Sequence, residues 1–146
     1  ANPGEQPRAL EKVASGGELS RIALALRTAL GSSGPAVPGG GPGRTLVFDE
    51  IDAGIGGRVA ETVGRRLKQL ASRFQVLCVT HLPQIASFAD HHLFVEKKET
   101  GGRATVVVRE LAGEERTHEI GRMLSGERVT TEALQHARQL LKMAGE

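Results

Sequence analysis

The chain has 146 residues and a formal net charge of +2 at pH 7. This length is sufficient for one domain with a hydrophobic core, and the charge is too small to indicate a nucleic-acid partner by itself. Trp and Tyr are absent and only four Phe occur, which excludes an aromatic platform for stacking nucleic-acid bases.

The apolar runs of the chain bear on its location. Residues 1–8 are polar and Pro-rich, and no apolar run approaches the ~20 residues that a membrane-spanning helix needs. We therefore expect a soluble, cytoplasmic protein with no membrane partner. The single cysteine, Cys78, excludes a disulfide within the chain, and its apolar neighbours predict a buried, unreactive thiol.

The first predicted element is a helix that follows a linker at residues 1–13. Ser15, followed three residues later by Glu18, is the capping-box pattern of a helix N-terminus. Apolar residues at helical spacing then predict one face that packs on a sheet: Leu19, Ile22, Ala23, Leu26 and Leu30. Residues 31–43, rich in Gly, Pro and Ser, predict a flexible loop.

An uncharged run that ends in carboxylates comes next. Residues Thr45 to Phe48 predict a buried strand covered on both faces, as in parallel α/β sheets. Ligands of such sheets bind beyond the C-terminal ends of the strands, where Asp49, Glu50 and Asp52 lie in the sequence. Asp49 is suited to hold Mg²⁺ and Glu50 to polarise a water molecule, while an ordinary acidic turn is the alternative.

The following elements continue the alternation of strands and helices. After a Gly-rich loop, a helix is predicted with one apolar face: Val59, Val63, Leu67 and Leu70. Residues 75–80 predict a second buried strand with His81 at its C-terminal end, and Pro83 suits the start of a short helix. This β–α–β order predicts two parallel strands.

The C-terminal part predicts a hairpin and two helices. Residues 92–98 and 103–111 alternate like hairpin strands around a Gly-containing turn, and helices are predicted around 118–124 and 131–143. Four basic residues lie on or just after the earlier helix: Arg65, Arg66, Lys68 and Arg73. We interpret them as a solvated face, with contact to DNA as the alternative.

The stretch Ser15-Gly16-Gly17-Glu18 carries its own chemistry. Two glycines at a helix N-terminus leave backbone N–H groups bare, so that an anion such as phosphate can approach closely. Standing alone, the stretch fits a merely well-capped helix equally well. Its combination with the carboxylates after the first strand and with His81 after the second favours a nucleotide site.

These motifs together resemble those of the ABC ATPase superfamily. The matching segments are Lys12–Arg21 for the signature motif, Leu46–Glu50 for the Walker B strand, Ile51–Gly57 for the D-loop and His81 for the switch histidine. Within the superfamily the sequence resembles the SMC-like proteins of bacterial DNA repair. Glu18 stands where transporters usually carry Gln, and the likeness continues through Thr80–Ala86 and Glu119–Gly126.

The resemblance implies an α/β fold, with residues 14–146 forming the C-terminal half of an ABC-type ATPase head. Such a half has a parallel sheet core flanked by helices, with a β-hairpin and C-terminal helices. No Walker A pattern G-x-x-x-x-G-K-[ST] occurs, and the Gly-rich residues 39–45 carry Arg44 where that pattern needs Lys. The resemblance therefore implies an N-terminal half with the phosphate-binding loop, separated by a long coiled coil to which residues 1–13 would lead.

The resemblance also implies roles for individual residues. ATP and Mg²⁺ would be bound, with Asp49 supporting the metal, Glu50 acting as general base and His81 contacting the γ-phosphate. Ser15, Gly16, Gly17 and Glu18 would bind ATP held by a second head, and Asp52 would act in the D-loop across that dimer interface. DNA would be a further partner, at the nucleoid.

Two other functions are open at this point. An ABC transporter nucleotide-binding subunit is one, although it would usually show Gln at position 18 and Pro-Thr after the Asp49-Glu50 pair, where Ile51-Asp52 stands here. A scaffold that keeps the fold without hydrolysis is the other, and the presence of Glu50 argues against it.

Overall fold

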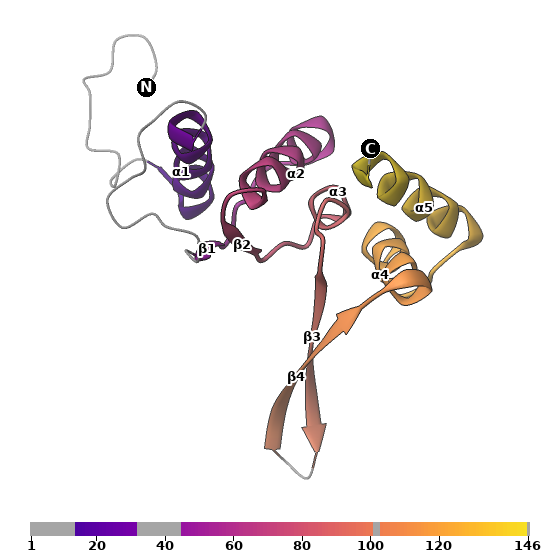
Figure 1. Ribbon diagram of the computed structural model, residues 1–146. Helices are drawn as coiled ribbons and strands as arrows, with labels where there is room; N and C mark the ends of the chain where they lie inside the picture. Colours follow the sequence, from indigo (N-terminus) through magenta and orange to yellow (C-terminus); the bar gives the residue numbers. More distant parts are fainter. Residues whose placement is uncertain (1–13, 32–44, 101–102, 146) are drawn as a thin grey trace, which may run out of the picture. The chain divides into compact units, whose positions relative to one another are not determined.

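The computed structural model describes residues 14–31, 45–100 and 103–145 (Figure 1). The predicted linker at 1–13, nearly all of the predicted loop at 31–43 and residues 39–44 of the Gly-rich stretch lie outside the described residues. The chain divides into two compact units, Ala1–Thr80 and His81–Glu146.

The first unit alternates helices and strands. Its elements are α1 (Gly16–Gly31), β1 (Thr45–Phe48), α2 (Gly57–Ala71) and β2 (Gln75–Cys78). The two strands pair in parallel, from Thr45 opposite Gln75 to Phe48 opposite Cys78. The parallel β–α–β pair predicted from the order of elements is therefore confirmed.

The predicted buried face of α1 is partly wrong. Leu24, which was not assigned to it, is buried, whereas Ile22 and Leu26 are exposed. Apolar residues occur around much of α1, so their spacing does not determine which face of the helix is buried. The packing of α1 on α2 selects it, because Leu24 lies at the gap that Val63 of α2 also lines.

The expectation that both strands are buried on both faces is also wrong. Leu46 and Phe48 are buried, but Val47 between them is 65% exposed and its neighbour in register, Leu77, is 45% exposed. Val79, just past β2, is exposed as well. The helices described in this unit leave this face uncovered, and a strand side becomes buried only where another element packs on it.

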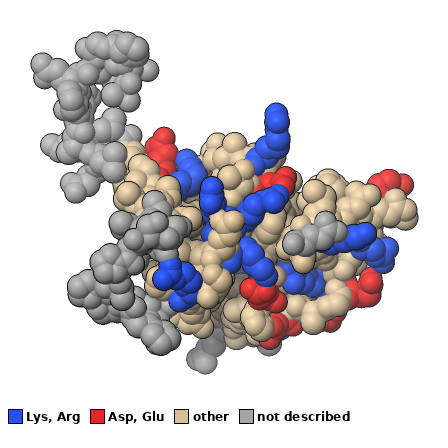
Figure 2. Space-filling model, turned by 45° about the horizontal axis from the view of Figure 1, so that its top comes forward, with Lys and Arg blue, Asp and Glu red and all other residues tan. Residues whose placement is uncertain are grey.

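Helix α2 has one apolar and one basic side. Its buried residues are Ala60, Val63, Gly64, Leu67 and Leu70, while Val59, predicted to join them, is exposed. Residues 57–73 contain five cations and one acid: Arg58, Arg65, Arg66, Lys68 and Arg73 against Glu61. All are at least partly exposed, and Figure 2 shows Lys and Arg predominating in the middle of one face.

The second unit contains the hairpin and the remaining helices. Its elements are α3 (Pro83–Ala86), β3 (His92–Thr100), β4 (Arg103–Leu111), α4 (Gly113–Ser125) and α5 (Thr131–Gly145). The strands β3 and β4 are antiparallel, from His92 opposite Leu111 to Thr100 opposite Arg103. The predicted hairpin and both C-terminal helices are confirmed, with α4 beginning earlier than expected.

The core of the second unit lies among its three helices. Ala86 of α3, Ile120 of α4 and Ala137 of α5 are buried together. Gly121 lets α4 and α5 approach closely, because a Cβ atom there would lie 3.2 Å from side-chain atoms of both Leu134 and Val129. None of the helices in the described ranges is both long and apolar enough to cross a membrane.

Candidate functional site

The first turn of α1 has the predicted capping box. The backbone N–H and the hydroxyl of Ser15 donate hydrogen bonds to Glu18 Oε2 at 2.8 and 2.9 Å, and the Glu18 N–H donates to Ser15 Oγ at 3.3 Å. The hydrogen bond from the Ser15 backbone N–H has the largest effect on the Glu18 carboxyl, followed by the bond from the Ser15 hydroxyl. Both hold the pKa of this carboxyl below its ordinary value. The start of α1 is therefore set by hydrogen bonds between two residues that are three positions apart in the sequence, Ser15 and Glu18.

The same end of α1 lies against the loop that follows β1. Ser20 Oγ donates to the carbonyl of Asp49 at 2.9 Å. Arg21 Nη1 donates to the carbonyls of Ile51 at 3.1 Å and Ala53 at 2.8 Å. The structure thus brings the Ser15–Glu18 stretch and the acidic loop together within one chain, through two side chains that sequence reasoning did not single out.

The two glycines of α1 are part of this contact. A Cβ atom at Gly17 would lie 2.6 Å from the carbonyl oxygen of Glu50 and 2.8 Å from Ala53 Cβ, and a Cβ atom at Gly16 would lie 2.9 Å from Glu50 Oε2. Gly17 is therefore required by the close approach of two backbone segments. Sequence reasoning assigned it to anion binding alone, because a glycine pair at a helix start is the signal for both.

The carboxylates of Asp49 and Glu50 are exposed at the C-terminal end of β1, as predicted. Glu50 has φ of 55°, a left-handed conformation that residues other than glycine adopt uncommonly and that is often found at functional sites. Its N–H donates to Asp49 Oδ1 at 2.9 Å. The loop therefore presents two neighbouring carboxylates outward from a constrained backbone.

The donor set of this loop fits Mg²⁺. Exposed carboxylate oxygens are the ligands that this ion prefers, and one or two of them suffice where phosphate oxygens and water complete the shell. Among the described residues, no group of three or more His, Cys, Asp or Glu side chains could hold a metal.

Asp52 lies inside the unit. The residue is only 5% exposed, and Thr80 Oγ1 donates to its Oδ2 at 2.6 Å. This bond joins the loop after β1 to the end of the β2 segment, and Ile51, which is fully buried, anchors the same loop. This bond does not test the predicted role of Asp52 across a dimer interface, which stays a prediction.

The pKa of Cys78, at the end of β2, is affected by the carboxylates of this region. Burial first, and then the carboxylates of Asp52 and Asp49, raise the pKa of its thiol to about 12. The predicted unreactive thiol is thus half-buried and close to the acidic loop. His81, the remaining predicted site residue, begins the second unit and is exposed immediately before Leu82, the N-cap residue of α3.

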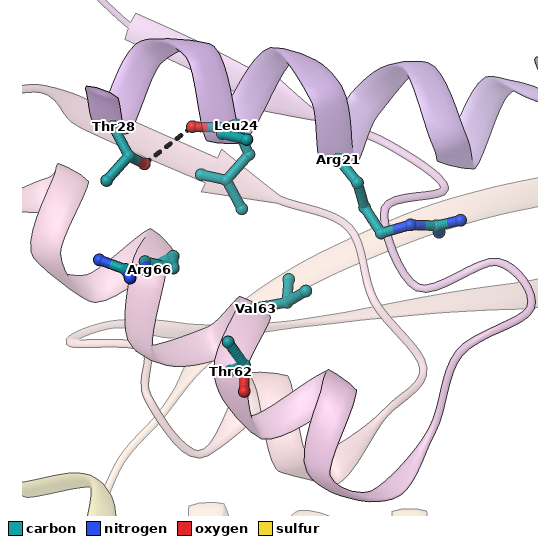
Figure 3. Close-up of a pocket in the computed structure, with 7 residues that line it drawn as sticks. Arg21, Leu24, Thr28, Thr62, Val63 and Arg66 are labelled. Carbon is teal, nitrogen blue, oxygen red and sulfur yellow. Dashed lines mark hydrogen bonds between the residues drawn. The ribbon is translucent and has the colours of Figure 1, made fainter. Parts of the chain in front are cut away.

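A separate cavity of about 390 Å³ lies between α1 and α2 (Figure 3). Its lining residues are Arg21, Leu24, Ala25, Thr28, Thr62, Val63 and Arg66. The carboxylates of Asp49 and Glu50 do not line it. The cavity is an apolar gap between two packed helices, distinct from the acidic loop that carries the predicted chemistry.

Comparison with known proteins shows what the chain is similar to. It is 53% identical over 141 residues to the DNA repair protein RecN of Deinococcus radiodurans, covering 97% of this chain and 23% of that protein. It is 45% identical over 143 residues to RecN of Halalkalibacterium halodurans, covering 98% and 24%, and 42% identical over 145 residues to RecN of Bacillus subtilis, covering 99% and 24%. Over nearly its whole length the chain is therefore similar to one segment of these RecN proteins.

This segment spans about a quarter of the length of its RecN relatives. The resemblance to SMC-like repair proteins is confirmed. A solved structure described as concerning ATP-driven dimerization and DNA-stimulated activation of SMC ATPases matches the fold, with a TM-score of 0.50 and 22% identity over 86% of this chain and 70% of that one. The predicted fold class is confirmed by this match. No model of a known protein family matches the chain.

Proposed function

We propose that this RecN segment is the C-terminal half of an ATPase head, which binds a second head on ATP and hydrolyses the nucleotide during repair of DNA double-strand breaks. One observation carries the proposal: the start of α1 is hydrogen-bonded to the loop that presents Asp49 and Glu50. The similarity to RecN proteins and to an SMC ATPase fold supports it.

The exposed carboxylates act on the phosphates and on water in this proposal. Glu50, exposed beyond β1, accepts a proton from the attacking water. Asp49 supports Mg²⁺, which when bound neutralises charge on the phosphate oxygens. His81, exposed at the start of the second unit, donates a hydrogen bond to the γ-phosphate.

The start of α1 serves the nucleotide of the second head. Ser15, Gly16 and Glu18 are exposed, whereas Gly17 is buried, so the start of this first turn can face a phosphate from outside the chain. Asp52 contributes by holding the D-loop through Thr80, while Ala53 and Gly54, which are exposed, face the second head. ATP then joins the two heads, and hydrolysis releases them.

The N-terminal half of the same protein completes the head. RecN relatives are about four times as long as this chain, and the uncovered apolar face at Val47, Leu77 and Val79 needs a packing partner. We propose that the half carrying the Walker A loop covers this face. In this arrangement, the separate segment binds ATP weakly and does not hydrolyse it.

DNA is the second partner in the proposal. Helix α2 and the two residues that follow it, 57–73, carry five cations against one acid. The remaining carboxylates described in the first unit belong to the proposed nucleotide site: Glu18, Asp49, Glu50 and Asp52. Such a segregated basic face suits contact with the phosphates of DNA without regard to sequence. The protein would then work at the nucleoid, in the cytoplasm.

The experiment that tests the ATPase proposal uses Glu50→Gln in the complete RecN protein. We expect turnover to fall by roughly 10²–10⁴, with ATP binding retained and ATP-bound dimers accumulating. The matched control is Glu61→Gln, which removes an exposed carboxylate paired with Arg65 at 2.9 Å on α2 and should leave turnover unchanged. Wild-type turnover in Glu50→Gln would remove the general base from the proposal.

A second assay addresses the split head and the rival scaffold function. The purified segment should show no ATPase activity alone and should gain it when an N-terminal half with a Walker A loop is added. A completed head that binds ATP without turnover would favour the scaffold. Tight binding of Mg-ATP at micromolar concentration by the separate segment would contradict the split-head arrangement.

A further inference from the structure

The short helix α3 is held at its C-terminal end by an arginine from another helix. α3 has only four residues, Pro83–Ala86, and the last carbonyls of any helix lack partners within it. Arg116 Nη2 donates to the carbonyl oxygens of Ala89 at 2.6 Å, Ser87 at 3.0 Å and Ala86 at 3.4 Å. One guanidinium therefore holds the backbone that leaves α3.

The helix that supplies this arginine is itself anchored in the core. Arg116 belongs to α4, and Ile120, one turn further along α4, is fully buried and packs with Ala86. Helix α4 thus contacts α3 in two ways, through hydrophobic packing and through the hydrogen bonds of the Arg116 guanidinium. Burial lowers the pKa of Arg116, and the charge of Asp90 opposes this change, but an arginine remains charged in a protein.

The backbone on the other side of α3 leads to His81. Leu82, which follows His81, is the N-cap residue of α3, and its carbonyl accepts hydrogen bonds from the N–H groups of Ile85 at 3.0 Å and Ala86 at 3.1 Å. The chain from Leu82 to Ala89 is therefore a continuous hydrogen-bonded segment that Arg116 closes at its far end. A shift of α3 would move the residue that precedes it.

We propose that Arg116 is a positioning residue for His81, holding α3 so that the histidine keeps its place relative to the backbone of the second unit. This proposal rests on the function proposed above for His81. The arginine holds three backbone carbonyls at the end of α3, although its Nε is buried without a hydrogen-bond partner among the described residues, which is costly to the fold. Costs of this kind are expected at functional sites.

The test is a double-mutant cycle in the complete RecN protein, with Arg116→Met, His81→Ala and both together. We expect Arg116→Met to lower kcat by up to ~10²-fold through misplacement of the histidine, with KM for ATP unchanged. In the His81→Ala background, Arg116→Met should cause no further loss, because the residue through which it acts is gone. Arg116→Lys should restore part of kcat, since it keeps the charge without the guanidinium fork.

The control variant for Arg116→Met is Arg138→Met. Arg138→Met removes an exposed arginine of the same unit that pairs with Glu114 at 3.1 Å, and should leave kcat unchanged. Equal losses from Arg116→Met with and without His81 would overturn the proposal, as would full activity of Arg116→Met. Full activity of His81→Ala would instead overturn the proposed function of the histidine.

A second measurement covers the case in which Arg116→Met does not fold. Hydrogen exchange of the Ala86 and Ser87 amides, which close the turn of α3, can be followed in Arg116→Lys and in Arg138→Met. We expect faster exchange in Arg116→Lys only, accompanied by a lower kcat. Unchanged exchange in both variants would show that Arg116 does not hold α3.

Discussion

Gly17 and Glu50 meet backbone to backbone: a Cβ atom added at Gly17 would lie 2.6 Å from the carbonyl oxygen of Glu50. The contact joins the first turn of α1 to a loop residue with positive φ. A glycine of the motif proposed to serve a second head therefore also packs against Glu50, the proposed general base of its own chain. The two candidate functions of this loop and helix are coupled by packing.

The first prediction compares the two glycines of α1. Gly17→Ala should lower the free energy of unfolding by about 1–3 kcal/mol, because backbone atoms must shift to admit the methyl group. Gly16→Ala should cost less, since the nearby Glu50 Oε2 is the end of a flexible side chain that can rotate away. Chemical denaturation of both variants of the complete protein measures the difference, and equal losses would contradict the close backbone approach.

The second prediction concerns Ser15, whose side chain is exposed. Ser15→Arg in the complete protein should retain ATP binding through its own Walker A loop and lose ATP-driven dimerisation and hydrolysis, because bulk and charge block the facing surface. The cap itself is worth only about 0.5–2 kcal/mol, so the head should stay folded. Size-exclusion chromatography with ATP and a turnover assay provide the two readouts.

Mixed dimers test whether Ser15 acts on the ATP site of the second head or on that of its own head. Ser15→Arg subunits are mixed with subunits whose Walker A loop is disabled. In a two-fold dimer both defects then fall in one site, and the other site is intact, so part of the ATPase activity should return. Absence of recovery in well-folded, demonstrably mixed dimers would count against action across the interface.

The third prediction concerns the reactivity of Cys78. Burial and the nearby carboxylates of Asp52 and Asp49 raise its pKa to about 12, so at pH 8 alkylation should be roughly 10³-fold slower than for a free thiol of pKa ~8.5. The folded state holds the thiol proton more tightly. This contribution to stability is complete below pH ~8.5 and is lost as the pH rises toward about 12.

Mass spectrometry after iodoacetamide treatment of the folded protein between pH 7 and 9 measures this rate. It should rise tenfold per pH unit without a plateau. Asp52→Asn should increase it, because one of the charges that raise the thiol pKa is removed. A plateau near pH 9 would mean that the thiol behaves as an ordinary exposed one.

The fourth prediction tests the basic side of α2. Arg66→Ala with Arg73→Ala should weaken binding of the complete protein to duplex DNA regardless of sequence, and should reduce the slope of log K against log salt by roughly 0.9 per lost phosphate contact. The control replaces Lys97 and Arg138, exposed cations of the second unit. An equal effect of the control pair would mean that overall charge, and not this surface, binds DNA.

Much of the fold follows from local pattern. The capping box at Ser15 and Glu18 and the hairpin were predictable because each depends on neighbours within a few residues or on a simple period. The parallel pair of strands was predictable from the order of strand, helix and strand. The position of Asp49 and Glu50 beyond the first strand also follows from the sequence, since an uncharged run of four residues ends there.

The sequence by itself determined where helices and strands lie, which motifs they carry and hence the family. Only the tertiary structure decided that Leu24 and not Leu26 is buried, that Val47 is uncovered, and that Asp52 pairs with Thr80. The hydrogen bonds from Arg116 to the backbone after α3 were likewise decided by the tertiary structure. The physical reason is that periodicity marks the side of an element that can be buried, whereas packing between residues far apart in the chain decides which partner covers it.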